Sequence, residues 1–148
     1  MYSISTLLPS PTKTHRLHKA LSALAAFGVA LSLSAVPASA SPLTNWYTQT
    51  GLPTTTALTK ASHEFKTAPT AALHLMESTA TNALAVPPPR SANGTFAFRW
   101  ASSMTYYQVG ASLALQALKD NSSAEMNTAA TDIGDGNTQM GLATKAMP

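Results

Sequence analysis

The stretch that decides the fold runs from Phe96 to Leu118 and reads FAFRWASSMTYYQVGASLALQAL. Its apolar residues recur at alternating intervals of three and four positions: Ala97, Trp100, Met104, Tyr107, Ala111, Ala114 and Leu118. This spacing places them on one face of an α-helix. Gly110 lies within the stretch, where glycine weakens a helix by about 1 kcal/mol relative to alanine. The same glycine also allows a neighbouring helix to approach closely.

A second helical pattern follows after a break at residues 119–121. Ser122 and Glu125 form a capping-box sequence, in which the serine side chain accepts from a free backbone N–H and the glutamate reaches back. The next apolar residues share one helical face: Met126, Ala129, Ala130, Ile133, Met140, Ala143 and Met147. Gly136 and Asn137 leave a small gap in that face. Because the break has three residues, we expect the two helices to form an antiparallel hairpin.

The chain before this hairpin contains another regular helix and a stiff connector. Pro69 marks the start of the helix, because a proline in the first turn lacks only an N–H that would have no partner there. The helix has one apolar face, made by Ala72, Leu73, Met76, Ala80, Ala83 and Leu84. The consecutive prolines Pro87–Pro89 cannot continue it. We interpret residues 87–94 as an extended connector.

The segment from Leu43 to Thr67 has a less regular pattern. Its inward face is indicated by Trp46, Leu58, Ala61 and Phe65. Gly51 and Pro53 interrupt it, and an internal proline kinks or splits a helix. We predict a short helix that ends at Thr50 and a second that starts at Pro53, together forming one kinked element.

The composition of residues 41–148 favours helices over sheet. Valine and isoleucine total only three residues in this range, whereas alanine supplies 19 and leucine ten. Sheet cores normally draw on β-branched residues, and alanine and leucine are good helix formers. The sequence therefore predicts one all-α domain over residues 41–148, an antiparallel four-helix bundle with a kinked first helix.

Residues 1–40 have the order of a secretory signal peptide. Lys13, Arg16 and Lys19 make the first part basic, and residues 20–36 form an uncharged apolar run of 17 residues. Residues 37–40, Pro-Ala-Ser-Ala, end in a small-x-small cleavage pattern. We predict cleavage after Ala40 and a secreted, extracellular chain. The alternative is an uncleaved membrane anchor, although 17 residues is near the lower limit for crossing a hydrocarbon core of about 30 Å.

The charge balance and the absence of cysteine each exclude one class of protein. Residues 41–148 contain six basic and six acidic residues, so the net charge of +3 lies in the leader. A nucleic-acid-binding domain needs clustered lysine and arginine on its folded part, and we expect no nucleic-acid partner. The sequence has no cysteine, which excludes a disulfide scaffold.

Residues with catalytic or metal-binding chemistry are few. His63-Glu64 and the pair His74 and Glu77 combine a histidine with a carboxylate, and two such groups three positions apart can share a metal. A di-iron bundle needs further glutamates at set positions that the sequence lacks, so we interpret both pairs as exposed polar residues. Ser112 lies in a Gly-x-Ser-x-Ala sequence, but a nucleophile elbow requires a strand, a turn and a helix around its serine.

Residues 132–137, Asp-Ile-Gly-Asp-Gly-Asn, are acidic enough to suggest calcium. Their oxygen-bearing side chains fall at positions 1, 4 and 6, whereas an EF-hand loop uses positions 1, 3 and 5 and a glutamate at position 12. We favour a stretch of helix whose small residues face a large neighbour. The sequence thus predicts no enzymatic activity, no catalytic residue, no cofactor and no metal site.

Aromatic residues offer the best candidate contact surface. Trp100 and Tyr107 lie on the apolar face, where packing in a core is the default. Phe96, Phe98 and Tyr106 lie off that face or at its edge. Exposed together, they would form an apolar patch of the kind that marks an interaction site. We predict that this patch contacts an extracellular or cell-wall partner.

One pattern extends over nearly all of residues 41–148: an early tryptophan (Trp46), the prolines at 87–89, Trp100 with Tyr107 one heptad later, and Gly136-Asn137 followed by Ala143-Thr144. This pattern resembles the small secreted four-helix proteins of actinobacteria, a group without an assigned function. The resemblance implies an exported helical bundle and no catalytic residue. Such proteins often carry cysteines on their second and third helices, and this chain has none.

The function expected from the sequence is that of a secreted or cell-envelope-associated binding module without enzymatic activity. One alternative is a structural homo-oligomer, in which the alanine-rich faces of two copies pack together. Another is a membrane-anchored protein that retains its N-terminal helix. Once the leader is cleaved, we expect no membrane contact.

Overall fold

The computed structural model describes residues 41–147, which are helical apart from short connections. The helical segments follow in the order α2 (Pro42–Trp46), η1 (Tyr47–Gly51), α3 (Leu52–Glu64), α4 (Pro69–Ala85), α5 (Gly94–Asp120) and α6 (Ser123–Ala146). Because α2, η1 and α3 follow one another directly, this part of the chain contains four helical rods and no strand. The predicted all-α fold is confirmed. The predicted signal peptide lies outside the described residues.

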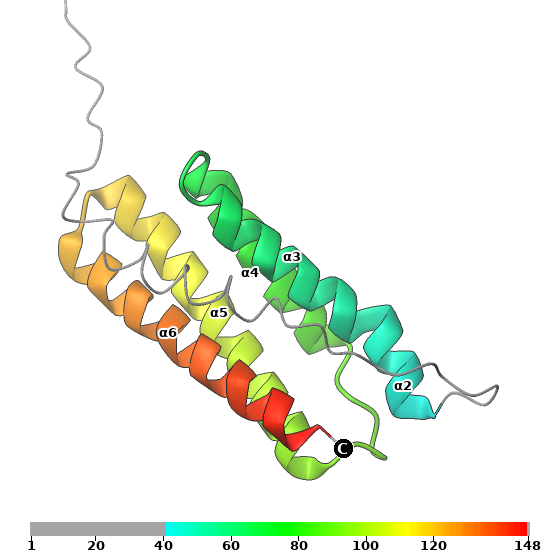
Figure 1. Ribbon diagram of the computed structural model, residues 1–148. Coiled ribbons are helices and arrows are strands. Elements are labelled where there is room, and N and C mark those ends of the chain that lie inside the picture. The colour runs from blue at the N-terminus through cyan, green and yellow to red at the C-terminus, as the bar shows by residue number, and fades with distance from the viewer. Residues whose placement is uncertain (1–40, 148) are drawn as a thin grey trace, which may run out of the picture.

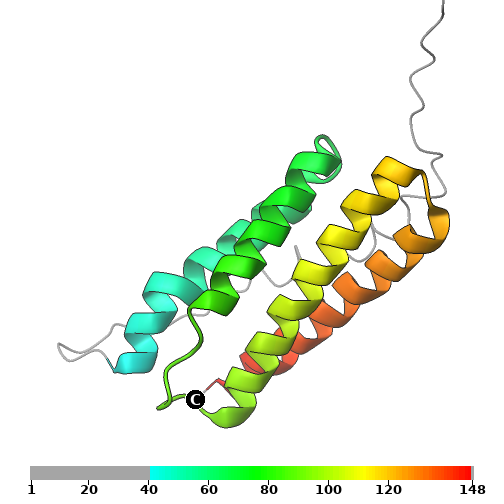
Figure 2. The same cartoon turned by 180° about the vertical axis from the view of Figure 1, so that it is seen from behind.

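The four rods lie in two layers, and consecutive rods run antiparallel (Figure 1). α3 and α6 form one layer, and α4 and α5 form the other, as the reverse view shows (Figure 2). The most extensive contact joins α5 with α6, followed by α4 with α5 and α3 with α4. Between residues 41 and 147, α3 and α6 share at most a marginal contact. The bundle is therefore open on that side, and α4 and α5 are its two inner members.

The first rod changes its hydrogen-bond pattern where the sequence predicts an interruption. η1 is a π-helical turn, and the backbone stays right-handed helical through Gly51 and Leu52 into α3. Pro53 lies in the first turn of α3. The wider π-helical turn before it accommodates the proline ring and the backbone hydrogen bond that proline cannot donate. A Cβ atom on Gly51 would lie 2.7 Å from Cδ2 of Tyr47. The two predicted helices are joined, and the kink between them stays a prediction.

The predicted inward faces of the first rod and of α4 are confirmed. Trp46, Leu58, Ala61 and Phe65 are buried, as are all the predicted apolar residues of α4 except Leu84, which is half-buried. α4 begins at Pro69, as predicted. The connector ends one residue earlier than predicted, because Asn93 caps α5 and its Oδ1 accepts a hydrogen bond from the backbone N–H of Thr95 at 2.8 Å.

The turn between α5 and α6 is shorter than predicted, because both helices are capped within it. Asn121 adopts the left-handed conformation with φ 54°, and this ends α5. The N–H of Ser122 donates to the backbone O of Ala117 at 3.0 Å. The Ser122 side chain accepts from the N–H of Glu125 at 3.3 Å, which confirms the serine half of the capping box. Its other half is replaced by the bond to Ala117.

Glycine allows α5 and α6 to pack closely at two positions. A Cβ atom on Gly110 of α5 would lie 2.8 Å from Cγ1 of Ile133. A Cβ atom on Gly136 of α6 would lie 2.8 Å from the ring of Tyr107. Real Cβ atoms do not come so close to a neighbour, so each contact requires a glycine. The predicted close approach at Gly110 and the small residues facing a large neighbour in α6 are both confirmed.

Two buried hydrogen bonds cross the same interface. The hydroxyl of Ser103 donates to the backbone O of Gly136 at 2.8 Å, and the hydroxyl of Tyr107 donates to Oδ1 of Asn137 at 3.0 Å. Burial raises the pKa of the Tyr107 hydroxyl far above its ordinary value, and the nearby Ser103 hydroxyl opposes that rise. The α5–α6 hairpin thus combines close backbone contact with satisfied buried polar groups.

Large aromatic rings join the first rod to α5. Trp46 packs edge-on against Trp100 and Phe96, with ring centroids 5.0 and 5.9 Å apart. Its Nε1 donates to the backbone O of Val86 at 2.9 Å, which also ties the end of α4 to this cluster. Within the described part of the chain, Nε1 of Trp100 and Oη of Tyr47 are buried without a hydrogen-bond partner. We call Trp46, Tyr47, Phe96 and Trp100 the aromatic cluster.

None of the helices in residues 41–147 has both the length and the apolarity that crossing a membrane would require.

Candidate functional site

α4 has a polar stripe next to its buried face. Thr70, His74, Glu77 and Thr81 follow one another at intervals of four, three and four positions, so they lie on one side of the helix. Thr81 donates a hydrogen bond through Oγ1 to the backbone O of Glu77 at 2.8 Å. This bond holds the Thr81 side chain in one orientation.

α5 provides a second polar stripe, facing the same boundary. Gln108, Ser112 and Gln116 are spaced four positions apart, and Lys119 follows in the last turn of the helix. Ser112 and Gln116 are exposed, and Gln108 is half-buried. Because α4 and α5 are packed together, the two polar stripes line the boundary between them.

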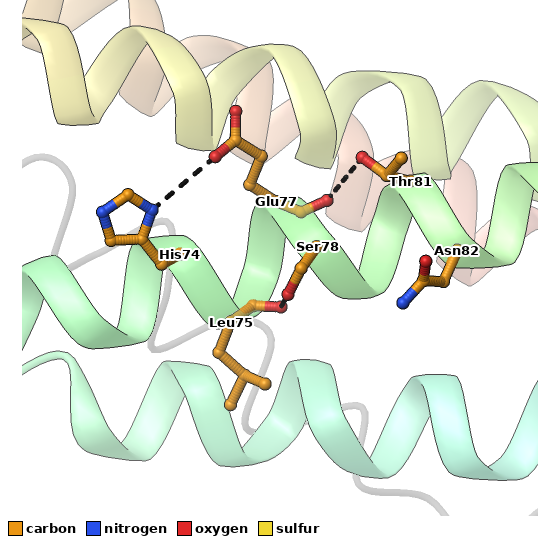
Figure 3. Close-up of a pocket in the computed structure, with 6 residues that line it drawn as sticks. All are labelled: His74, Leu75, Glu77, Ser78, Thr81 and Asn82. Atoms are coloured by element: carbon orange, nitrogen blue, oxygen red, sulfur yellow. Dashed lines mark hydrogen bonds and ion pairs between the residues drawn. The ribbon is translucent and has the colours of Figure 1, made fainter.

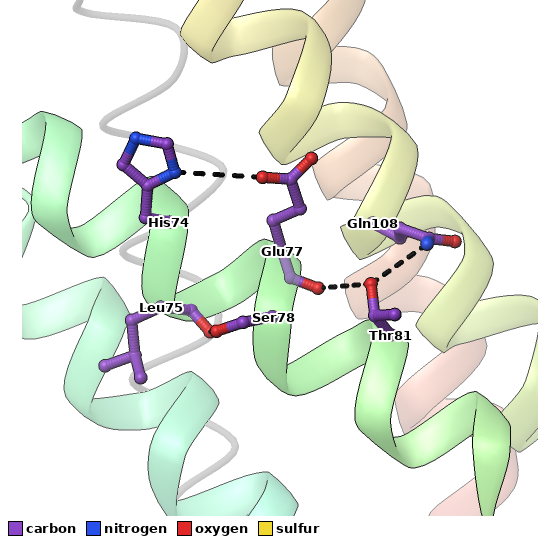
Figure 4. Close-up of polar contacts among 6 residues, drawn as sticks. All are labelled: His74, Leu75, Glu77, Ser78, Thr81 and Gln108. Carbon is purple, nitrogen blue, oxygen red and sulfur yellow. Dashed lines mark hydrogen bonds and ion pairs between the residues drawn. The ribbon is translucent and has the colours of Figure 1, made fainter.

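A hydrogen bond between the two helices links the stripes (Figure 4). Nε2 of Gln108 donates to Oγ1 of Thr81 at 2.9 Å. The Thr81 hydroxyl already uses its proton toward Glu77, so it can only accept from Gln108. This requirement fixes which end of the Gln108 amide faces Thr81. The hydrogen bond therefore orients the Gln108 amide across the boundary of α4 and α5.

Three adjoining hollows lie on α4 and along its boundary with α5, and the first of them is lined by α4 alone. The first, of about 530 Å³, is lined by His74, Leu75, Glu77, Ser78, Thr81 and Asn82 (Figure 3). The second, of about 510 Å³, is lined by Thr70, His74, Leu115, Gln116, Lys119 and Asp120. The third, of about 340 Å³, is lined by Glu77, Gln108, Val109, Ser112, Leu113 and Gln116. Because each pair of hollows shares a residue, we treat the three as one surface feature, the α4–α5 groove.

His74 and Glu77 lie where the hollows meet. Nδ1 of His74 is 3.8 Å from Oε2 of Glu77, and the two side chains are 65% and 34% exposed. An exposed pair of this kind contributes at most about 1 kcal/mol, and only while the histidine is protonated. Among residues 41–147, no group of three or more His, Cys, Asp or Glu residues is arranged to hold a metal ion.

The groove is close to neutral. Glu77 and Asp120 supply two negative charges, and Lys119 supplies one positive charge, to which His74 adds a second when it is protonated. The remaining polar side chains of the lining are uncharged amides and hydroxyls that both donate and accept hydrogen bonds. Such a lining can hold a neutral polar ligand, but it gives little attraction for a strongly charged one.

His63 and Glu64, the second histidine–carboxylate pair of the sequence, have separate surroundings. Oε1 of Glu64 lies 3.7 Å from Nζ of Lys60 on the exposed side of α3. His63 is exposed at the end of the same helix. Ser112 lies in the middle of the continuous helix α5, so the strand and turn of a nucleophile elbow are not present around it.

The acidic stretch at residues 132–137 lies inside α6, which is helical from Ser123 to Ala146. A continuous helix cannot wrap its side chains around one ion as an EF-hand loop does. Burial raises the pKa of the Asp132 carboxyl, and the nearby charge of Asp135 raises it further. The negative charge of Asp135 therefore disfavours the ionised form of Asp132.

The predicted aromatic patch needs correction at Phe96. This side chain is only 2% exposed and belongs to the aromatic cluster. α5 packs against both α4 and α6, and Trp46 also reaches it, so its buried arc is wider than one stripe of residues indicates. Phe98 is 63% exposed with the guanidinium of Arg99 5.6 Å from its ring, and Tyr106 is half-buried. The three residues therefore do not form one exposed patch.

Comparison with protein-family models, with curated proteins and with solved structures gave no match to this chain. The resemblance to secreted actinobacterial four-helix proteins accordingly stays a prediction.

No prediction from the sequence includes the α4–α5 groove. A signal for it exists, because polar residues recur with helical spacing at 70, 74, 77 and 81 and again at 108, 112 and 116. Polar stripes of this kind are usually solvated surface, and only the packing of α4 on α5 brings the two together.

Proposed function

We propose that the protein is an exported binding module without enzymatic activity, and that it holds its ligand in the α4–α5 groove. The observation that carries this proposal is the ordered polar contact across the groove, from Gln108 to Thr81 and on to the backbone of Glu77. Side chains that are ordered beforehand lose less conformational entropy when a ligand binds.

The position of the groove supports the same proposal. Both of its walls are inner helices of the bundle, and each has a packed helix behind it, α3 behind α4 and α6 behind α5. A site built on well-supported helices keeps its geometry better than a site on loops. The export signal predicted for residues 1–40 makes an extracellular or cell-wall component the expected partner.

Retention of the purified protein by extracellular material would test the groove directly. Culture medium and cell-wall fractions are immobilised, and the full chain is compared with the double variant Gln108→Leu/Gln116→Leu. We expect the double variant to be retained at least about fivefold less, because each lost hydrogen bond contributes about 1 kcal/mol. Gln49→Leu makes the same chemical change at an exposed position outside the groove and provides the control.

Equal retention of all three proteins, or retention of none, would remove the groove as the binding site. Circular dichroism of each variant shows whether the helices remain formed. Export is tested separately by mass spectrometry of the protein in the medium, where we expect a chain that begins at Ser41. A full-length chain that stays with the membrane fraction would favour the anchored form.

A structural homo-oligomer is a second candidate, favoured by the exposed ring of Phe98. Large exposed apolar side chains are common at contacts between subunits. Sedimentation equilibrium at micromolar concentration distinguishes the two functions. A dimer that dissociates in Phe98→Asp would support the homo-oligomer, and a monomer at all concentrations would exclude it.

A further inference from the structure

We infer that the ligand of the α4–α5 groove is an uncharged polysaccharide that lies along the groove with its hydroxyl groups on the two polar stripes. This inference rests on the proposed function and adds the chemical class of the ligand. It follows from the hydrogen-bonding character of the lining, the length of the groove, its charge and its apolar surface.

The lining matches the hydrogen-bonding properties of sugars. A sugar hydroxyl both donates and accepts, and the best partners are side chains that do the same. The groove contains six such side chains besides Thr70: Ser78, Thr81, Asn82, Gln108, Ser112 and Gln116. The hydroxyls of Ser78 and Thr81 already donate to the backbone O atoms of Leu75 and Glu77, so toward a ligand these two only accept. A ligand that only accepts or only donates would leave part of this capacity unused.

The groove is long, shallow and open at the surface. Its polar residues extend from Thr70 to Thr81 on α4, which corresponds to about 17 Å at the rise of an α-helix. Two of the hollows follow one another along the boundary of α4 and α5, and the third lies beside them on α4. A linear chain of sugar rings can contact both hollows of the boundary, whereas a single sugar would occupy one.

Apolar side chains lie between the polar ones. Val109 is 48% exposed, and Leu75, Leu113 and Leu115 are half-buried along the lining. The C–H faces of sugar rings can pack against such side chains and remove apolar area from water. None of the lining residues is Phe, Tyr or Trp, so each sugar ring gains little and affinity must come from several rings at once.

Three other ligand classes fit the groove less well. An extended peptide often binds by adding a strand to a sheet edge, but the backbone groups of α4 and α5 bond within their own helices. A helical partner needs a hydrophobic groove with apolar anchors, and this groove is mostly polar. A strongly charged polymer finds near-balanced charges from Glu77, Asp120 and Lys119.

Titration of the isotope-labelled full chain by NMR tests the inference. The probes are soluble hexasaccharides of β-1,4-linked glucose, α-1,4-linked glucose and α-1,6-linked mannose, with oligogalacturonate as a charged control and an uncharged soluble peptide. We expect at least one neutral hexasaccharide to shift the side-chain amide signals of Gln108 and Gln116. Its disaccharide should bind at least about tenfold more weakly, because fewer rings engage the groove.

Variants separate binding at the groove from loose contact elsewhere. Gln108→Leu/Gln116→Leu should raise the dissociation constant of that hexasaccharide at least about fivefold, and Gln49→Leu should leave it within about twofold. The backbone spectrum reports whether each variant is folded, and Thr81→Val provides a second change in the groove if the double variant is not.

Three results would overturn the inference: no shift with any neutral hexasaccharide, stronger binding of oligogalacturonate, or binding of the peptide at the same residues. If groove-dependent retention by extracellular material persists in those cases, the proposed function stands and the ligand class is wrong. If that retention is also absent, both the inference and the proposed function fail.

Discussion

The α5–α6 hairpin and the first helical rod are held to the bundle in different ways. The hairpin uses small residues, with Gly110 and Gly136 allowing the helices to approach, and its buried hydroxyls cross to the other helix. The first rod, formed by α2, η1 and α3, uses large rings at one end, centred on Trp46. It contains a π-helical turn and a buried tyrosine hydroxyl without a partner among residues 41–147.

The difference shows how an alanine-rich sequence can make a stable centre without a large apolar core. Close helix approach increases the number of van der Waals contacts per residue. The attraction from each contact is small, but the sum over many contacts is large. Buried hydroxyls are tolerated there because their hydrogen bonds are satisfied. At the aromatic cluster, burial of large rings stabilises the contact, while the unsatisfied polar atoms of Tyr47 and Trp100 oppose it.

Replacement of Trp46 by alanine should have the largest effect on stability. It removes the ring that joins the first rod to α5 and the hydrogen bond to Val86. We expect a loss of about 3–5 kcal/mol in the free energy of unfolding, measured by urea denaturation with circular dichroism. Trp46→Phe keeps a ring and should lose clearly less. A loss below about 1 kcal/mol for the alanine variant would show that the cluster does not hold the first rod.

A pair of glycine substitutions in α6 tests the close approach of the hairpin. In Gly136→Ala the new methyl group meets the Tyr107 ring at 2.8 Å, and the expected cost is about 1–3 kcal/mol of overpacking. Gly134 is on the same helix and has nothing within 4 Å of a Cβ atom. Gly134→Ala should therefore stabilise by about 0.5–1 kcal/mol, through helix propensity alone. Thermal melts that move in the same direction for both variants would contradict the tight contact.

The two buried tyrosines provide a smaller and more specific comparison. Tyr107→Phe removes the hydrogen bond to Asn137 and should cost about 1 kcal/mol. Tyr47→Phe removes a hydroxyl that is buried without a partner in the described chain, and should be neutral or stabilising. Chemical denaturation of both variants measures the difference. A larger loss for Tyr47→Phe would show that its hydroxyl has a partner.

The same tyrosines predict an alkaline limit to stability, the smallest effect because it is absent near neutral pH. Burial raises the pKa of Tyr107, and also that of Tyr47, above the ordinary value. Burial of the two protonated hydroxyls contributes to the free energy of unfolding in full below the unfolded pKa of about 10. This contribution is lost as the pH rises through the pKa values of the folded state, because the unfolded chain loses these protons first. Unfolding curves from pH 9 upward measure this loss. The free energy of unfolding of Tyr107→Phe should fall less steeply with pH than that of the parent protein. An identical slope would place the alkaline transition elsewhere.

Much of the fold could be predicted from the sequence. The apolar stripe around Trp100, the proline at Pro69 and the cap at Ser122 are local signals, and each acts within one or two helical turns. These signals correctly predict the buried face of α5 and the starts of α4 and α6, because helix formation depends on neighbouring residues. The small residues at Gly110 and Gly136 also indicated a close neighbour.

Features that depend on tertiary contacts could not be predicted in this way. Phe96 is off the apolar stripe of α5, and the Trp46 ring from another rod packs against it. The π-helical turn before Pro53 has no distinct sequence pattern. The α4–α5 groove needs the register of two helices, because Thr81 meets Gln108 across 27 positions of sequence. A periodic pattern of apolar or polar residues identifies one face of one helix, but it does not identify the helix that packs against that face.

Native-state hydrogen exchange of the full chain, resolved by residue, tests the central difference between the two regions most directly. We expect the amides of α5 and α6 around Tyr107 and Ile133 to exchange only through global unfolding. The amides of η1 and the first turns of α3 should exchange through a smaller opening, with a free energy clearly below the global value. Protection that is highest in η1 and α3, and lower in the hairpin, would contradict this account.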